Sequence, residues 1–149
     1  MLLDVEREAA SARLRPHWKP DDHLLTVLAR NAREHPDTVA LRERDHGIWQ
    51  EYSWSNYLDT VLAFAAGLEM QGVAAGDILL IIGDNRPNLY FAMLGAIALR
   101  AVPSPAYSDT PPDELAGQLI RENICFAVAE DQEQVDKLIL AREIGRAHV

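Results

Sequence analysis

One segment, residues 78–109, constrains the fold of this 149-residue chain more than any other. Its first part, Ile78–Ile82, is a short run of apolar residues between an aspartate and a glycine, which is typical of a strand covered on both faces. A polar loop follows, and Pro87 suits the first turn of a helix. Val102–Ala106 then resumes a strand pattern. We therefore predict a βαβ unit, which places ligand sites beyond the carboxyl ends of its strands.

Within this unit we expect Asp84 and Asn85 to cap the helix. The residues expected to form its apolar stripe against the sheet recur at helical spacing: Leu89, Tyr90, Met93, Leu94, Ile97 and Ala98.

Other elements flank the unit on both sides. Before it we expect a helix that carries Leu24, is capped by Asp21 or Asp22 and stops before Pro36. We also expect a hairpin of strands 38–42 and 48–52 turning at 45–47, and then a helix capped by Ser53 and ended by Gly72. The residues expected on the buried face of that last helix are Trp54, Tyr57, Leu58, Val61, Leu62, Ala65 and Leu68. After the unit we expect a helix from Pro111 to Arg121, a buried strand from Ile124 to Ala129, and a helix from Asp131 to Arg142 with Val135, Leu138 and Ile139 inward.

The sequence also resembles a known enzyme family. GDNRP at 83–87 and AVPSPAYSD at 101–109 are similar to the N-terminal part of the AMP-forming acyl-CoA synthetases, and AEDQEQVDKL at 129–138 favours the long-chain fatty-acid CoA ligases among them. The resemblance covers about Leu24 to Arg142. It implies an α/β fold: the N-terminal subdomain, in part, of an adenylate-forming enzyme, with a mostly parallel sheet flanked by helices and preceded by a helix and a β-hairpin.

The resemblance implies a two-step reaction for the full-length parent. A fatty-acid carboxylate attacks ATP to give acyl-AMP and pyrophosphate, and CoA then displaces AMP, with Mg²⁺ required. The glycine-rich phosphate loop and the mobile lysine of the family lie further along than this chain reaches. Its lysines are Lys19 and Lys137, and no glycine-rich loop leads into Lys-Ser or Lys-Thr. We therefore assign no catalytic, cofactor-binding or metal-binding residue, and expect the fragment alone to be inactive.

Several residue groups carry weaker functional hypotheses. The histidines lack the spacing of a metal site: His17, His23, His35, His46 and His148. Asp84-Asn85-Arg86 and Tyr107-Ser108-Asp109 can face a ligand at a strand end, although a helix cap and a surface turn explain them as well. Glu130 to Asp136 fits a solvated helix face better than an acid–base pair. Cys125 fits a buried core thiol better than a nucleophile.

Composition excludes some classes of protein. Acidic residues outnumber basic ones by 23 to 14, giving a net charge of -9, which disfavours nucleic-acid binding. We expect no transmembrane segment, because no apolar run approaches the roughly 20 residues a span needs. The lone cysteine favours a reducing cytoplasm, and peripheral association with a membrane remains open.

We divide the chain into an N-terminal arm at 1–20, the first part of an AMP-binding (adenylation) domain at 21–143, and a terminal segment at 144–149. That last segment, Ile144-Gly145-Arg146-Ala147-His148-Val149, can be encoded by ATCGGAAGAGCACACGTC, which resembles a sequencing-library adapter. On this interpretation the rest of the domain is missing. The alternatives are a self-contained, non-enzymatic α/β binding or interaction module, and another branch of the adenylate-forming family.

Two residues depart from the family pattern. Arg100 stands where glycine is usual at the end of a helix, so a left-handed backbone there would cost about 1 kcal/mol. Ser104 replaces an aliphatic strand residue, so its hydroxyl needs a hydrogen-bond partner.

Overall fold

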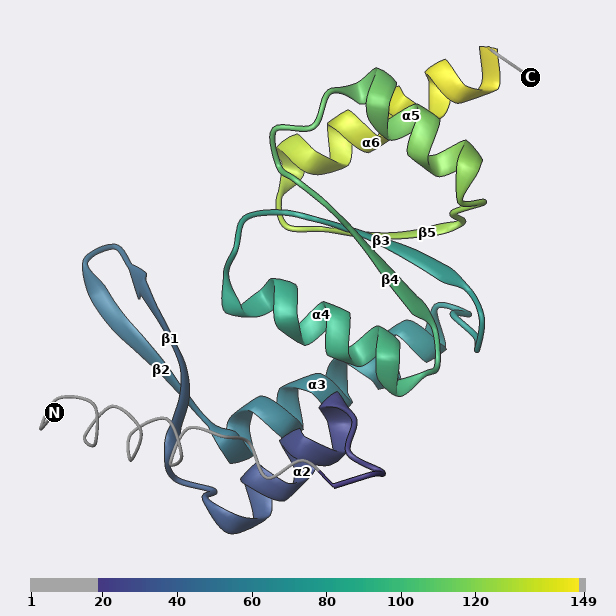
Figure 1. Cartoon of the computed structure of the whole chain (residues 1–149). Coiled ribbons are helices and arrows are strands. Elements are labelled where there is room, and N and C mark those ends of the chain that lie inside the picture. Colours follow the sequence, from purple (N-terminus) through teal and green to yellow (C-terminus); the bar gives the residue numbers. More distant parts are fainter. Residues whose placement is uncertain (1–18, 148–149) are drawn as a thin grey trace, which may run out of the picture.

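A computed structural model describes residues 19–147 (Figure 1). The elements in chain order are α2 (Leu24–Glu34), β1 (Val39–Asp45), β2 (Ile48–Ser53), α3 (Trp54–Met70), β3 (Ile78–Ile82), α4 (Pro87–Ala98), β4 (Val102–Ala106), α5 (Pro112–Arg121), β5 (Phe126–Ala129) and α6 (Gln132–Ala147). The strands form an antiparallel hairpin, β1-β2, and a parallel sheet in the order β4-β3-β5. This is the α/β fold that the sequence predicts. No helix in this part of the chain is long and apolar enough to cross a membrane.

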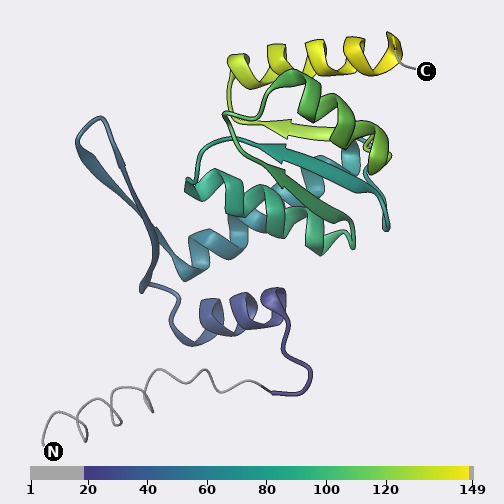
Figure 2. The same cartoon turned by 45° about the horizontal axis from the view of Figure 1, so that its top comes forward.

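The parallel sheet is the middle of three layers, with α3 and α4 on one face and α5 and α6 on the other (Figure 2). Successive side chains of its central strand, β3, point toward the two helical layers in turn. Leu79 and Ile81 pack into the cluster formed with α3 and α4, whereas Leu80 and Ile82 pack into the cluster formed with α5 and α6. These four side chains are at most 2% exposed, so the prediction of a strand covered on both faces is confirmed.

The hairpin and α2 are joined to the rest by a separate core cluster. Tyr57 of α3 and Phe91 of α4 meet edge-to-face with ring centroids 5.3 Å apart, and Tyr52 of β2 lies 5.4 Å from Phe91. The predicted hairpin turn is confirmed, because His46 (φ 47°) and Gly47 (φ 83°) both have the left-handed backbone that a tight hairpin turn requires. The aromatic contacts therefore anchor an otherwise exposed hairpin.

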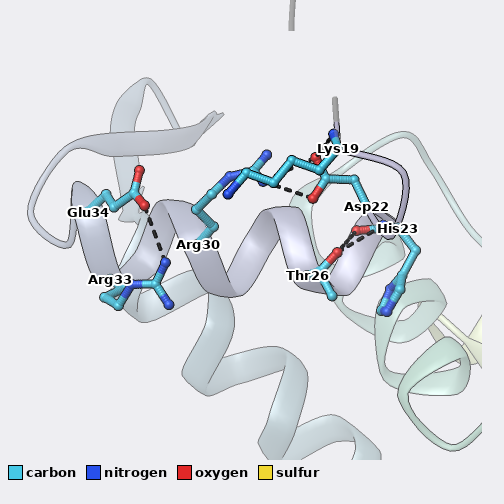
Figure 3. A network of polar contacts seen from close by, with 7 residues as sticks. All are labelled: Lys19, Asp22, His23, Thr26, Arg30, Arg33 and Glu34. Carbon is cyan, nitrogen blue, oxygen red and sulfur yellow. Dashed lines mark hydrogen bonds and ion pairs between the residues drawn. The ribbon is translucent and has the colours of Figure 1, made fainter. Parts of the chain in front are cut away.

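The start of α2 differs from the prediction that Asp21 or Asp22 caps it (Figure 3). His23 is the N-cap residue, and its N–H donates to the hydroxyl oxygen of Thr26 at 2.8 Å. Asp22 instead accepts from Arg30 at 2.8 Å and from the backbone N–H of Lys19 at 2.8 Å. The hydrogen bond from Arg30 is the main cause that lowers the pKa of Asp22. Asp22 therefore forms an ion pair with Arg30 and does not cap the helix.

The apolar stripe predicted for α4 is wrong in part. The fully buried side chains are Phe91, Ala92 and Ala96, whereas Tyr90 is 39% exposed. The reason is that α4 packs against both the sheet and its neighbour α3, so it has two contact faces rather than one. Gly95 allows the close approach to α3, since a Cβ on it would lie 3.1 Å from the Cβ of Phe64. Pro87 begins the helix as predicted, but the N-cap is Arg86, without a side-chain cap.

The C-terminal elements depart most from prediction. Cys125 is exposed rather than buried, and so is Ala127, because β5 is an edge strand. On α6, Val135 and Ile139 are 38% and 45% exposed, whereas Gln134 and Ala141 are buried. The helix continues to Ala147.

The start of α3 agrees with prediction, because the hydroxyl of Ser53 accepts a hydrogen bond from the N–H of Asn56 at 3.2 Å. The buried face predicted for this helix is wrong at Leu62, which is 53% exposed.

Ser104 has the partners that its position in a strand demands. Its hydroxyl donates to Glu122 at 2.5 Å and accepts from Gln118 at 2.9 Å. Both partners lie at the end of α5, so the hydroxyl joins β4 to that helix.

Candidate functional site at the carboxyl edge of the sheet

The carboxyl ends of β3, β4 and β5 meet at one edge of the parallel sheet. Polar side chains that follow each strand surround an open cleft of about 750 Å³ there. The residues that line it are Asp84, Arg86, Asn88, Ser108, Asp109, Glu130, Asp131, Glu133, Gln134 and Lys137. Ligands of open α/β sheets bind at this edge, so it is the candidate functional site.

Glu130, the first residue after β5, reaches across to the loop that follows β3. Its Oε2 accepts a hydrogen bond from the N–H of Asp84 at 2.5 Å, and its Oε1 lies 3.4 Å from Nε of Arg86. Gly83 makes this reach possible. A Cβ at Gly83 would lie 2.7 Å from both Cβ and Oε2 of Glu130, so any larger residue would displace that side chain.

The loop after β4 is tied to both neighbours. The hydroxyl of Ser108 donates to Oδ1 of Asp84 at 2.8 Å. The backbone carbonyl of Ser108 accepts a hydrogen bond from Nζ of Lys137 on α6. Lys137 also donates to the side-chain carbonyl of Gln134 at 3.1 Å. Side chains therefore join the end of β3 to the ends of both β4 and β5, and they join the loop after β4 to α6.

Charge in the cleft is mixed. Five carboxylates and two cations line it, so acidic groups predominate. The acids are Asp84, Asp109, Glu130, Asp131 and Glu133, and the cations are Arg86 and Lys137. These groups can orient a polar ligand, but they include no nucleophile paired with a base. Among residues 19–147 no three histidine, cysteine or acidic side chains are placed to hold a metal ion.

The structure brings only some of the residues proposed from the sequence to the cleft. Arg86, Asp109 and part of Glu130–Asp136 line the cleft with Asp84 and Ser108. Asn85 does not line it and instead accepts from the hydroxyl of Tyr90 at 2.6 Å, while Tyr107 is 82% exposed. The hairpin carries His46, and His23 and His35 border α2. His17 and His148 lie outside the described residues.

Sequence reasoning missed the roles of Glu130 and Lys137. Glu130 was interpreted as part of a solvated helix face, and Lys137 was given no role, because nothing in the local pattern distinguishes them from other surface charges. The available signal was position. Glu130 comes directly after a parallel strand, at the edge where ligands bind.

Two apolar grooves run along β5 away from this cleft. One, of about 770 Å³, lies between β5, α5 and α6 and includes Cys125 and Ile139 in its lining. The other, of about 590 Å³, lies between β5 and α3 and includes Phe64. Among the described residues, the outer edge of β5 is thus flanked by exposed apolar surface on both faces.

Comparison with known proteins identifies the family. The model of the AMP-binding enzyme family matches residues 28–148. This chain belongs to that family. Among curated relatives, an acetyl-coenzyme A synthetase of Shewanella sp. (strain ANA-3) is 36% identical over 128 residues, which cover 75% of this chain and 20% of the relative. The chain thus spans about a fifth of the length of that family member.

Solved structures support the same fold. The inhibitor-bound N-terminal domain of FACL13 from Mycobacterium tuberculosis matches with a TM-score of 0.71 at 18% identity, over 79% of this chain and 29% of that one. The N-terminal subdomain of NpsA from Klebsiella oxytoca matches with a TM-score of 0.65 at 24% identity, over 73% and 28% of the two chains. This chain therefore has the fold of those two N-terminal units.

Proposed function

We propose that this chain is the N-terminal part of an ATP-dependent acyl-CoA synthetase. The parent enzyme joins a carboxylic acid to AMP with release of pyrophosphate and then transfers the acyl group to the sulfur of CoA. Membership of the AMP-binding enzyme family is the observation that carries this proposal. The match to an acetyl-coenzyme A synthetase supports thioester formation as the second step.

In this proposal the chain supplies scaffold and one wall of the ligand cleft. The polar edge formed by Asp84, Ser108, Glu130 and Lys137 lies where α/β sheets bind ligands. Neither the mobile lysine nor the phosphate loop of the family is found here. In this proposal other parts of the parent bind Mg²⁺, ATP and the reacting end of CoA. We propose a cytoplasmic location for it.

We propose a long-chain fatty acid as the substrate of the parent. Support for this choice comes from the segment 129–138, whose sequence resembles the long-chain branch. Acetate is the second candidate, because the acetyl-coenzyme A synthetase relative is 36% identical. The two acids differ in the apolar surface they bury, so they need acyl sites of different size.

The test is an assay of the full-length gene product with palmitate, acetate and an aryl acid in separate reactions. Pyrophosphate release and acyl-CoA formation with palmitate above acetate support the proposal. Activity with acetate alone supports the second candidate. Release of pyrophosphate with the aryl acid or with amino acids only would place the parent in another branch.

A further inference from the structure

We propose that Glu130 is a positioning residue, and that with Asp84, Ser108 and Lys137 it forms a clamp that fixes the three strand ends around the cleft. The four residues follow β3, β4 and β5, and are called here the strand-end clamp. The kinetic part of this inference rests on the proposed function, whereas the structural part does not.

The clamp is a series of three hydrogen bonds, and the stretch of chain between residues 130 and 137 completes the circuit. It runs from Glu130 to the backbone of Asp84, from the side chain of Asp84 to the hydroxyl of Ser108, and from the carbonyl of Ser108 to Lys137. Lys137 lies on α6, only seven positions after Glu130, so the circuit ends on the segment where it began. The loop at Asp84 is consequently bonded to both Glu130 and Ser108, and the loop at Ser108 to both Asp84 and Lys137.

Glu130 uses both of its carboxylate oxygens in the clamp. One carboxylate oxygen binds the loop backbone at Asp84 and the other lies near Arg86, so the carboxylate joins β5 to the start of α4. Hydrogen bonds to a charged acceptor are stronger than neutral ones. The absence of a side chain at Gly83 leaves the room that this contact needs. A glutamate and a glycine 47 positions apart therefore serve one contact.

The clamp matters for ligands because its members also line the cleft. Loops that are already fixed lose less conformational entropy when a ligand binds. Opening the clamp should weaken binding in ground state and transition state alike, which raises KM and leaves kcat close to native.

The amide of Asp84 offers a direct readout. Asp84 is exposed and lies outside every helix and strand, and the carboxylate of Glu130 is the acceptor that its N–H has in the described structure. In the full-length protein, Glu130→Ala should speed hydrogen exchange at Asp84 by about tenfold, the change equivalent to about 1.4 kcal/mol. Glu130→Gln keeps a carbonyl acceptor there and should restore most of the protection. Exchange in β3 should stay as in the native protein.

Glu51→Ala is the matched control, because Glu51 forms an ion pair with Arg42 at 3.0 Å on the distant hairpin. Kinetics with acid, ATP and CoA varied separately should show a higher KM for at least one of them in Glu130→Ala and native values in Glu51→Ala. If Glu130→Ala does not fold, Ser108→Ala opens the same circuit at a milder site and should also speed exchange at Asp84.

Unchanged exchange at Asp84 in both clamp variants would overturn the inference. So would a fall in kcat with every KM unchanged. If the full-length protein forms no acyl-CoA from any acid, the proposed function fails, and exchange at Asp84 still decides whether the clamp exists.

Discussion

The backbone N–H of Gly76 donates a hydrogen bond to the carbonyl oxygen of Arg100, 3.0 Å away. This bond joins the turn that precedes β3 to the turn that ends α4. Arg100 accepts it with a left-handed backbone, at φ 62°. The conformation expected from the sequence is therefore present, and an arginine rather than a glycine adopts it.

Arg100→Gly should stabilise the domain. Glycine adopts the left-handed region without the steric cost that arginine incurs, although it adds entropy to the unfolded chain, so we expect a net gain of about 0.5 kcal/mol. Denaturant unfolding measures it. Arg100→Ala is the control, because alanine keeps the strain and should give no gain. Equal stabilisation by both variants would show that the charge of Arg100, and not its left-handed backbone, lowers the stability of the domain.

Gly83→Ala should destabilise the domain by about 2 kcal/mol, because the added Cβ would overlap Glu130 and force the side chain away. Gly67→Ala is a matched substitution in the last turn of α3, where a Cβ meets nothing within 4 Å. It should stabilise by about 1 kcal/mol through helix propensity. Thermal unfolding of both variants checks the contrast, and a neutral Gly83→Ala would contradict the packing described for Glu130.

The domain should lose stability at alkaline pH. Burial raises the pKa of Tyr57, and burial followed by the hydrogen bond to Glu43 raises the pKa of Tyr52 above the ordinary 10.0. The folded state thus holds these protons more tightly than the unfolded chain. Their contribution is complete below pH 10.0 and is lost as pH rises through the folded pKa values.

Tyr52→Phe should reduce this alkaline loss, because phenylalanine has no proton to release. Denaturant unfolding at a series of pH values measures the slope. Tyr107→Phe is the control, since Tyr107 is 82% exposed. Native alkaline slopes in both variants would argue against a role for Tyr52.

Local sequence pattern predicted the elements whose signals are local. The limits of β3, β4 and α5 follow from short apolar runs and from prolines, and Ser53 and Gly72 mark the ends of α3 as expected. The prediction failed where one residue serves a tertiary contact. Asp84 was available as a helix cap, but its side chain binds Ser108, 24 positions away.

The candidate site was predictable only in outline. The βαβ pattern located the edge where ligands bind, and it named Asp84, Arg86, Ser108 and Asp109. Glu130 and Asp84 are 46 positions apart, and their contact depends on β5 pairing beside β3. Burial of Cys125 was wrong for the same kind of reason, because periodicity cannot show which strand lies at an edge.

The origin of residues 144–149 is a separate prediction. Ile144 and Gly145 pack near α5 as part of α6, and that packing does not bear on the source of the codons. We expect the genomic reading frame to differ from this sequence after codon 143 and to reach a Ser/Thr/Gly-rich loop that ends in lysine. Amplification across codon 143 from genomic DNA measures this directly. A genomic frame that encodes these six residues would contradict it.

The 149-residue chain on its own should self-associate and bind a hydrophobic dye. β5 has no partner on its outer side in the described structure, and grooves of about 770 and 590 Å³ expose apolar side chains on both of its faces. Exposed edges and apolar patches of this kind promote association.

Ile139→Lys places a charge in the larger groove and should lower both dye fluorescence and apparent mass in light scattering. Leu62→Lys changes a leucine that is 53% exposed and lines neither groove, so it should leave both readings unchanged. A native chain that is a monodisperse monomer, melts sharply and binds no dye would contradict this prediction and favour a self-contained binding module.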